Sequence, residues 1–421
     1  MASPRFVFAL LAFPVVTAAL TAQTAHKPTL DEALKQARAP IYLADGKFSG
    51  AGADVLLQAV AQSKFVLLGE DHLTREIPEF AGALCDAMHP DAYAVEAGPE
   101  AAGFVDGLLK SPDRIARMAA RSRAHANNIA FLDVREENDL AAHCAAASRN
   151  PHFKLWGLDQ EFIGSAGTLL DAMIASQPGP LARAAIAAAQ AKEAAADQAV
   201  RSSGNPGLLF LLTSTDADVK ALEDGIKADG NGATQRLLRE FTVSRRIYQL
   251  NAEGSPDSNR MRAELLKQHL LDDYSKAKLE SADVRVLFKF GDDHLGMGLN
   301  VLHQRDLGNF VAELADGEGT RSLHILVLGA RGTHAIFAGY AKPLGHQPFV
   351  MSDDPEYKWI APAVADLLAE QPDKGGKTLT LFDLRTLRFR GIELPPEWER
   401  IVYGYDLFVL IPELTPGAFI E

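Results

Sequence analysis

Cysteine is scarce in this chain, with only Cys85 and Cys144 among 421 residues. The two are not spaced as Cys-x-x-Cys, which argues against a thiol-redox enzyme. Each lies in a helical pattern, at 79–88 and at 136–148. We expect two buried reduced thiols in preference to a disulfide, although in an oxidising compartment a disulfide between them is the alternative.

Motifs of several common enzyme classes are also absent. The sequence holds no Gly-x-Ser-x-Gly, which argues against the usual nucleophile elbow of serine hydrolases. It holds neither a Gly-x-x-x-x-Gly-Lys-Ser/Thr phosphate loop nor a His-Glu-x-x-His zinc motif. Basic residues are outnumbered, with 42 Lys and Arg against 55 Asp and Glu and a net charge of −13. Because no basic stripe is present, nucleic acid is not an expected partner.

Hydrophobic runs that approach membrane length are missing outside the N-terminus. There Arg5 precedes an apolar run at 6–22 that ends in small residues, which is typical of a secretory signal peptide. We expect cleavage near residues 22–25 and an exported protein, periplasmic or secreted. Pro14 and the shortness of the run argue against an uncleaved anchor, which needs about 20 apolar residues. After cleavage we expect no stable membrane insertion.

Short apolar runs that end in polar residues recur along the chain, with helical patterns between them. The runs lie at 64–68, 92–95, 153–156, 284–290 and 322–328. Near-continuous apolar runs of this length are typical of strands buried on both faces. Their alternation with helices predicts an α/β fold with a mostly parallel central sheet flanked by helices. Further strands are predicted at 377–382 and 405–411.

The stretch at 165–281 differs, because it is helical wherever it is periodic and rich in alanine near its start. It predicts a helical insertion, or cap, between two strands of the sheet. We therefore divide the chain into a signal peptide (1–25), a first part of the α/β core (26–164), the helical insertion (165–281) and a second part of the core with a C-terminal strand segment (282–421). The sequence does not indicate an oligomeric state.

Acidic residues and histidines gather directly after the apolar runs. Glu70 and His72 follow the first run, Glu96 follows the second, and His294 follows the fourth. Since ligands bind at the carboxyl ends of strands in open α/β sheets, we expect these four side chains to converge. Two carboxylates with two imidazoles suit water activation by a neutral histidine that a carboxylate polarises. They suit equally a divalent metal held by these four residues, with a position open for water.

Further residues near the strand ends are candidates for contact with the substrate or for support of the first four. Arg75 is expected to clamp an anionic group or to pair with Glu96. Lys289 lies inside an apolar run and is either an ion-pair partner or edge-facing. The remaining candidates are Asp159, Asp293 and Arg331.

Four short motifs resemble the superfamily of erythromycin esterases, ChaN-type haem-binding proteins and Tiki-type proteases. They are Val-Leu-Leu-Gly-Glu-Asp-His at 66–72 with Glu79 and Phe80, Ala-Val-Glu at 94–96, Gly-Leu-Asp at 157–159 and Lys-Phe-Gly-Asp-Asp-His at 289–294. The resemblance covers residues 50–160 and 282–340 and implies an α/β fold with a helical insertion. It also implies that the four strand-end residues match the esterase group's active-site carboxylates and histidines, where a histidine activates water without an obligatory metal.

The motifs do not single out one branch of this superfamily. The esterases have two residues between the Glu and the His and a Gly after the His, whereas this chain has one residue between them and Leu73 after them. That spacing is closer to the ChaN branch, whose members are lipid-anchored through a cysteine that this chain lacks near its N-terminus. Gly69 and His72 also fit the pattern of the metal-dependent Tiki-type proteases.

The sequence leaves three hypotheses open. The first is an exported hydrolase that cleaves an ester, amide or peptide bond in a small molecule or peptide, with a divalent metal or without one. The second is a protein that binds haem or metal in the same pocket without turnover, which needs a free axial ligand such as His72 or His294. The third is a scaffold with a decayed site, which requires Glu70 and His72 to lie too far from Glu96 and His294 to act together.

Overall fold

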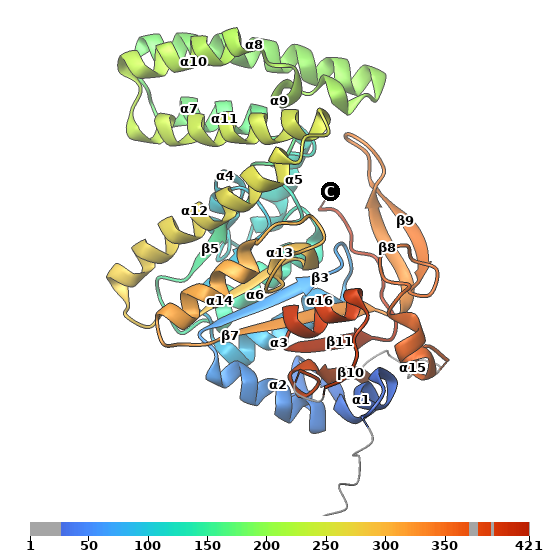
Figure 1. The fold of residues 1–421 in the computed structure, drawn as a ribbon. Helices are drawn as coiled ribbons and strands as arrows, with labels where there is room; N and C mark the ends of the chain where they lie inside the picture. Colours follow the sequence, from blue (N-terminus) through green and yellow to red (C-terminus); the bar gives the residue numbers. More distant parts are fainter. Residues whose placement is uncertain (1–26, 370–377, 389–390, 421) are drawn as a thin grey trace, which may run out of the picture.

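A nine-stranded sheet forms the centre of the molecule (Figure 1). The computed structural model describes residues 27–369, 378–388 and 391–420. The strands, in their order across the sheet, are β2 (Lys47–Ser49), β1 (Arg38–Ala44), β10 (Thr378–Asp383), β11 (Leu407–Ile411), β7 (Ser322–Gly329), β3 (Phe65–Glu70), β6 (Val286–Gly291), β4 (Ala92–Val95) and β5 (Lys154–Gly157). Neighbouring strands run parallel from β11 to β5 and antiparallel from β2 to β11. The predicted α/β fold with a mostly parallel sheet is confirmed.

Helices cover both faces of the sheet, which explains why most side chains of its central strands are apolar on both faces. Alternate side chains of β3 point to opposite faces. Val66 and Leu68 pack into one core with α2 (Ala51–Gln62), α3 (Glu76–Met88) and α6 (Arg135–Ala147). Phe65 and Leu67 pack into another with α12 (Asp257–Glu280) and α14 (Leu307–Gly317). The other helices outside the inserted segment are α1 (Leu30–Ala37), α4 (Pro99–Asp106), α5 (Arg114–Ala124), α13 (Asp292–Leu295), α15 (Ala365–Ala369), α16 (Pro396–Gly404) and the 3₁₀ turns Ala361–Val364 and Leu384–Thr386.

A disulfide joins Cys85 on α3 to Cys144 on α6. The expectation of two reduced thiols is therefore wrong. The two helices pack side by side on one face of the sheet and bring the cysteine Cα atoms to 5.1 Å. The sequence separates the cysteines by 59 residues and gives no sign of this helix pairing.

A segment of helices stands between β5 and β6, at the top of the view in Figure 1. It consists of α7 (Ala166–Ala175), α8 (Pro180–Ser203), the 3₁₀ turn Pro206–Leu208, α9 (Phe210–Thr213), α10 (Asp216–Asp229), α11 (Gly232–Ala252) and α12. Helices α7 to α11 share a core of their own, whereas α12 also packs on the sheet through Leu266 and Leu270. The predicted helical segment between strands is confirmed, and the division into domains stays a prediction.

Two segments for which the sequence analysis predicted no structural element lie beside the carboxyl end of the sheet. One is the hairpin of β8 (Arg331–Phe337) and β9 (Leu344–Val350). In the loop between these strands, the hydroxyl of Tyr340 donates to Asp197 on α8. The other is the C-terminal tail at 414–420. Its Gly417 donates to the carbonyl of Leu73 at 2.9 Å, and its Ile420 donates to the carbonyl of Asp133 at 2.8 Å. Both segments therefore lie next to the residues that follow β3.

The predicted signal peptide at 1–25 lies outside the described residues. Within the ranges that the structure describes, we find no helix that combines the length and the apolar composition needed to cross a bilayer.

Candidate active site

The carboxyl ends of three adjacent parallel strands bring the predicted residues together. Glu70 is the last residue of β3, Gly291 is the last residue of β6, and Glu96 directly follows β4. Since β6 lies between β3 and β4, Glu70 and Glu96 approach from its two sides. His294 arrives on α13, the short helix that begins directly after β6. The predicted convergence of Glu70, His72, Glu96 and His294 is what the structure shows, and their catalytic role stays a prediction.

His72 lies between two carboxylates. Its Nδ1 is 2.9 Å from Oε1 of Glu70, and its Nε2 is 3.3 Å from Oε2 of Glu96. The ring stacks on Phe131, with centroids 4.0 Å apart. Burial opposes a charged ring, but attraction to Glu96 and Glu70 outweighs it and raises the pKa of His72 to about 10. At neutral pH the residue is therefore an imidazolium, not the neutral base that the sequence led us to expect.

Glu96 contacts both histidines of the cluster. Its Oε2 accepts a hydrogen bond from the backbone N–H of Gly291 at 2.7 Å, and its Oε1 lies 3.6 Å from Nε2 of His294. Burial alone would raise the pKa of Glu96. The positive charges of His72 and His294 outweigh burial and hold that pKa well below its usual value. Glu96 is therefore a carboxylate.

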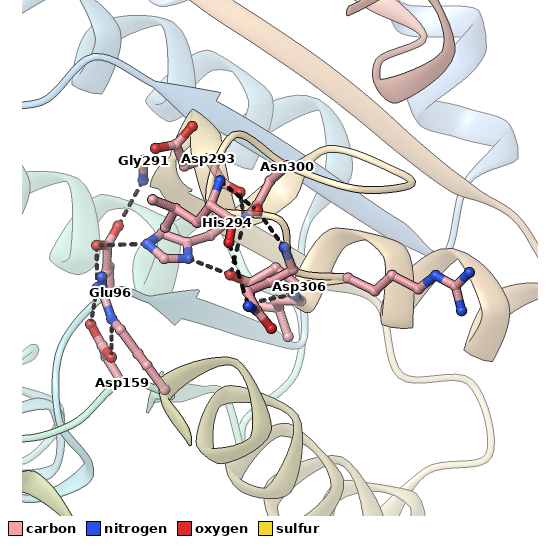
Figure 2. Close-up of polar contacts among 12 residues, drawn as sticks. Glu96, Asp159, Gly291, Asp293, His294, Asn300 and Asp306 are labelled. Atoms are coloured by element: carbon pink, nitrogen blue, oxygen red, sulfur yellow. Dashed lines mark hydrogen bonds and ion pairs between the residues drawn. The ribbon is translucent and has the colours of Figure 1, made fainter. Parts of the chain in front are cut away.

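The ring of His294 is oriented by Asp306, as Figure 2 shows. Nδ1 of His294 is 2.8 Å from Oδ2 of Asp306, whose other carboxyl oxygen accepts from the backbone N–H of Leu307 at the start of α14. Nε2 of His294 faces Glu96 beyond hydrogen-bond distance. Burial and Arg262 oppose a charged ring, yet Glu96 and Asp306 outweigh them and raise the pKa of His294. Sequence reasoning missed Asp306, which follows no strand.

Arg262 links the cluster to the inserted helices, and sequence reasoning missed it as well. It lies on α12, donates from Nη2 to Oε1 of Glu96 at 2.7 Å and from Nε to Oδ1 of Asp159 at 2.9 Å. Arg262 thus bridges Glu96 and Asp159, one of the predicted supporting residues (Figure 2). No motif surrounds Arg262, so nothing in the sequence distinguishes it from the other arginines of the helical segment.

Lys289 is an ion-pair partner, the first of the two predicted alternatives. Its Nζ contacts Oε1 of Glu70 and lies 2.6 Å from Oε1 of Glu137 on α6. Burial works against ionisation of Glu70, but Lys289 and His72 outweigh it, so the pKa of Glu70 is lowered. For Glu137 burial prevails over Lys289 and raises the pKa to about 7. Glu137 was missed, because an acid in the first turn of a helix has an ordinary explanation.

The remaining predicted residues lie around the cluster. Arg75 is exposed and pairs with Glu136 at 3.1 Å, not with Glu96. Arg331 donates to the backbone oxygen of Leu368. Asp293 belongs to a group of three carboxylates, with Asp292 and Glu356, whose oxygens lie within 4.8 Å of one another.

The four central residues fit a metal ion poorly. Among the described residues, the group of three or more acidic or histidine side chains with ligand atoms within 4.8 Å of one another is Asp292, Asp293 and Glu356, not these four. Both nitrogens of His72 face carboxylate oxygens, and Nδ1 of His294 faces Asp306. This leaves one imidazole nitrogen, Nε2 of His294, to serve as a ligand. The arrangement is one of alternating hydrogen-bonded charges, so we route no chemistry through a metal.

Comparison with known proteins gives a likeness in structure without one in sequence. No protein-family model matches the chain, and no curated protein matches it. Three solved structures match with a TM-score of 0.56. One is a Bacillus cereus protein with 14% sequence identity, and the match covers 92% of this chain and 98% of that chain. Another is a mutant of erythromycin esterase EreC in its open conformation, with 14% identity over 87% of this chain and 95% of that chain. The third is a succinoglycan biosynthesis protein, with 13% identity over 93% of this chain and 98% of that chain. Such low identity establishes the fold alone. The chain therefore has the fold of erythromycin esterase EreC, as its strand-end motifs predicted.

Proposed function

We propose that this chain is an exported hydrolase that cleaves an ester by activating water at the cluster of Glu70, His72, Glu96 and His294. One observation carries the proposal: Asp306 fixes the ring of His294 through Nδ1, while Nε2 faces the cluster without a hydrogen bond from the described part of the chain. A ring held in this way by a carboxylate is the arrangement of a general base. The fold shared with an esterase supports the same reaction class.

The two histidines then have different tasks. Once the ring of His294 has lost its own proton, its Nε2 takes a proton from water, and the hydroxide oxygen forms a bond to the carbonyl carbon of the ester. Because the pKa of His294 is raised, we expect the rate to increase with pH as the ring becomes neutral. His72, already an imidazolium, stabilises the developing negative charge through its positive charge, because both of its nitrogens face Glu70 and Glu96. The carbon–oxygen bond to the alcohol breaks, and the proton on His294 passes to the leaving oxygen. A carboxylic acid and an alcohol result, and the acid then releases its proton to solvent. Amide and peptide bonds are the alternatives that the same groups can serve.

Export is supported by two separate features. The apolar run at 6–22 is typical of a signal peptide. The disulfide between Cys85 and Cys144 is typical of proteins that reside in an oxidising compartment.

The test uses the mature chain, from about residue 26, and a panel of p-nitrophenyl esters, lactones and peptides. We expect hydrolysis of at least one ester, and a loss of kcat/KM of roughly 10²–10⁴-fold in His294→Asn. The matched control is His143→Gln, which breaks an exposed histidine–aspartate pair of 3.0 Å with Asp86 outside the cluster. An active His294→Asn variant would refute the assignment of the base, and an inactive wild type would count against the function.

The alternative of haem or metal binding has weaker support. An axial ligand needs a free imidazole nitrogen, which His72 does not offer. The hypothesis of a decayed site requires Glu70 and His72 to be distant from Glu96 and His294. Nε2 of His72 lies 3.3 Å from Oε2 of Glu96, and Nε2 of His294 lies 3.6 Å from Oε1 of Glu96. These short distances count against a decayed site.

A further inference from the structure

Lys289 is a charged residue within the apolar strand β6. It lies on β6, in register with Leu68 of β3 and Val95 of β4, and is 4% exposed. Leu287, two residues earlier and on the same face, packs into the core formed with α3 and α6. An ammonium group without partners would be strongly destabilising at this position. The reason for a lysine here must therefore be sought in the groups that it contacts.

The partners of Lys289 connect it to His72. Its Nζ donates to Oε1 of Glu137 at 2.6 Å and to Oε1 of Glu70. That same oxygen of Glu70 lies 2.9 Å from Nδ1 of His72. The other carboxyl oxygen of Glu70 is buried and has no hydrogen-bond partner in the described part of the chain. Two groups alone, Lys289 and His72, therefore set the orientation of Glu70.

The charges of the cluster alternate along one chain of contacts. In order, the members are Glu137, Lys289, Glu70, His72, Glu96, Arg262 and Asp159. His72 is in the middle, and each of its two carboxylates has a second cation on its far side: the buried Lys289 beside Glu70 and the partly buried Arg262 beside Glu96. Without Lys289, the buried carboxylate of Glu70 would have one cation beside it, His72, which it shares with Glu96. It would then compete for the proton on Nδ1 of His72.

We propose that Lys289 and Glu137 are positioning residues of the site: Lys289 keeps Glu70 ionised and turned toward Nδ1 of His72, and Glu137 holds Lys289 in place. The inference rests on the proposed function only in giving His72 a part in hydrolysis. The arrangement itself can be tested without a substrate. A pair that serves stability alone is available for comparison, because Lys64 lies 3.0 Å from Glu318, directly before β3 and at the opposite end of the strand from Glu70.

The test is a nuclear magnetic resonance measurement on ¹⁵N-labelled mature protein. The Nδ1–H signal of His72, assigned by its loss in His72→Gln, is compared between wild type, Lys289→Met and the control Lys64→Met. We expect the signal to shift or to broaden beyond detection in Lys289→Met and to stay in place in Lys64→Met. An unchanged signal in a folded Lys289→Met variant would overturn the proposal.

A second variant covers the case in which Lys289→Met does not fold. Glu137→Gln keeps an oxygen for Lys289 and removes the ionisable carboxyl group, and its folding is checked by circular dichroism. We expect the His72 signal to move in this variant as well. A folded Glu137→Gln protein with the wild-type signal would show that Glu137 has no positioning role.

Activity separates this inference from the proposed function. With a hydrolysed ester in hand, Lys289→Met is expected to lower kcat roughly a hundredfold with little change in KM, because misplacement of a reacting group has an effect of that size. Lys289→Arg should restore part of the loss, and Lys64→Met should cause none. If wild type hydrolyses nothing, the proposed function fails while the resonance measurement still decides the role of Lys289. If wild type is active and Lys289→Met keeps its kcat, the inference fails and the function stands.

Discussion

Arg262 lies 2.7 Å from Glu96, although 166 residues separate the two in the sequence. Arg262 belongs to α12 of the inserted helices, and Glu96 follows a strand of the sheet. Their contact makes the helical segment a contributor of charge to the cluster. The position of α12 on the sheet is therefore coupled to the electrostatics of Glu96.

Replacing Arg262 should impair the site through Glu96. Arg262→Met removes a guanidinium that donates to Glu96 and Asp159 together, and we expect kcat/KM to fall at least tenfold, about what one lost charge-assisted hydrogen bond of 1.5–3 kcal/mol produces. Arg262→Lys should restore little, because an ammonium cannot reproduce the fork of a guanidinium. Arg260→Gln is the control, since Arg260 is exposed on the same helix and pairs with Asp257 and Glu264. Equal losses in both variants would contradict this account.

Removal of metal should leave the activity intact. Both ring nitrogens of His72 and Nδ1 of His294 face carboxylate oxygens. We therefore expect the purified protein to hold far less than one equivalent of Mn, Co or Zn. Elemental analysis and absorbance spectroscopy measure metal and haem directly, and treatment with EDTA should not reduce hydrolysis. Stoichiometric metal that disappears in both His72→Ala and His294→Ala would reverse this conclusion. A Soret band lost in either variant would favour haem binding instead.

The charge on His72 should make stability depend on pH in the alkaline range. Its pKa is raised from the ordinary 6.5 to about 10 in the folded protein. Such a group contributes stability that is fully present below pH 6.5 and is lost as the pH rises through about 10. The difference in free energy of unfolding between wild type and His72→Gln should therefore shrink from pH 7 to pH 10. Urea titrations at several pH values measure it, and a difference that stays constant would contradict the assigned charge.

Reduction of the disulfide should destabilise the protein without disturbing the charges of the cluster. Cys85→Ala/Cys144→Ala removes a link between α3 and α6, and loss of such a bond typically costs about 2–5 kcal/mol. We expect a lower midpoint of urea unfolding, and the same shift for wild type in reducing buffer. Mass spectrometry of alkylated protein reports whether the thiols are free. If wild type is alkylated at both cysteines without prior reduction, the disulfide is not present in solution.

Much of the fold followed from the sequence, because β3 and β6 are buried on both faces and therefore read as continuous apolar runs. The acids and histidines after those runs were found for the same reason, since parallel strands deliver their ends to one edge. The hairpin of β8 and β9 was not predicted, because its strands are partly exposed and lack an apolar run.

Residues that act from helices were beyond sequence reasoning. Arg262, Asp306 and Glu137 reach the cluster through the packing of α12, α14 and α6, and a helix of polar residues does not reveal which of them turns inward. The protonation of His72 was missed for a related reason. Its charge depends on the distances to Glu70 and Glu96, which only the assembled sheet defines.

The C-terminal tail has a practical consequence for how this protein is produced. Thr415 accepts a hydrogen bond from the backbone N–H of Arg75 at 3.0 Å, and Gly417 donates to Leu73, so the tail lies against the residues that directly follow His72. A purification tag fused behind the tail would begin next to Ile420, which donates to the carbonyl of Asp133 at 2.8 Å. Removal of the last few residues would instead open the residues after His72 to solvent. Tags are better placed before residue 27, where the described chain begins on the far side of the sheet from the tail (Figure 1).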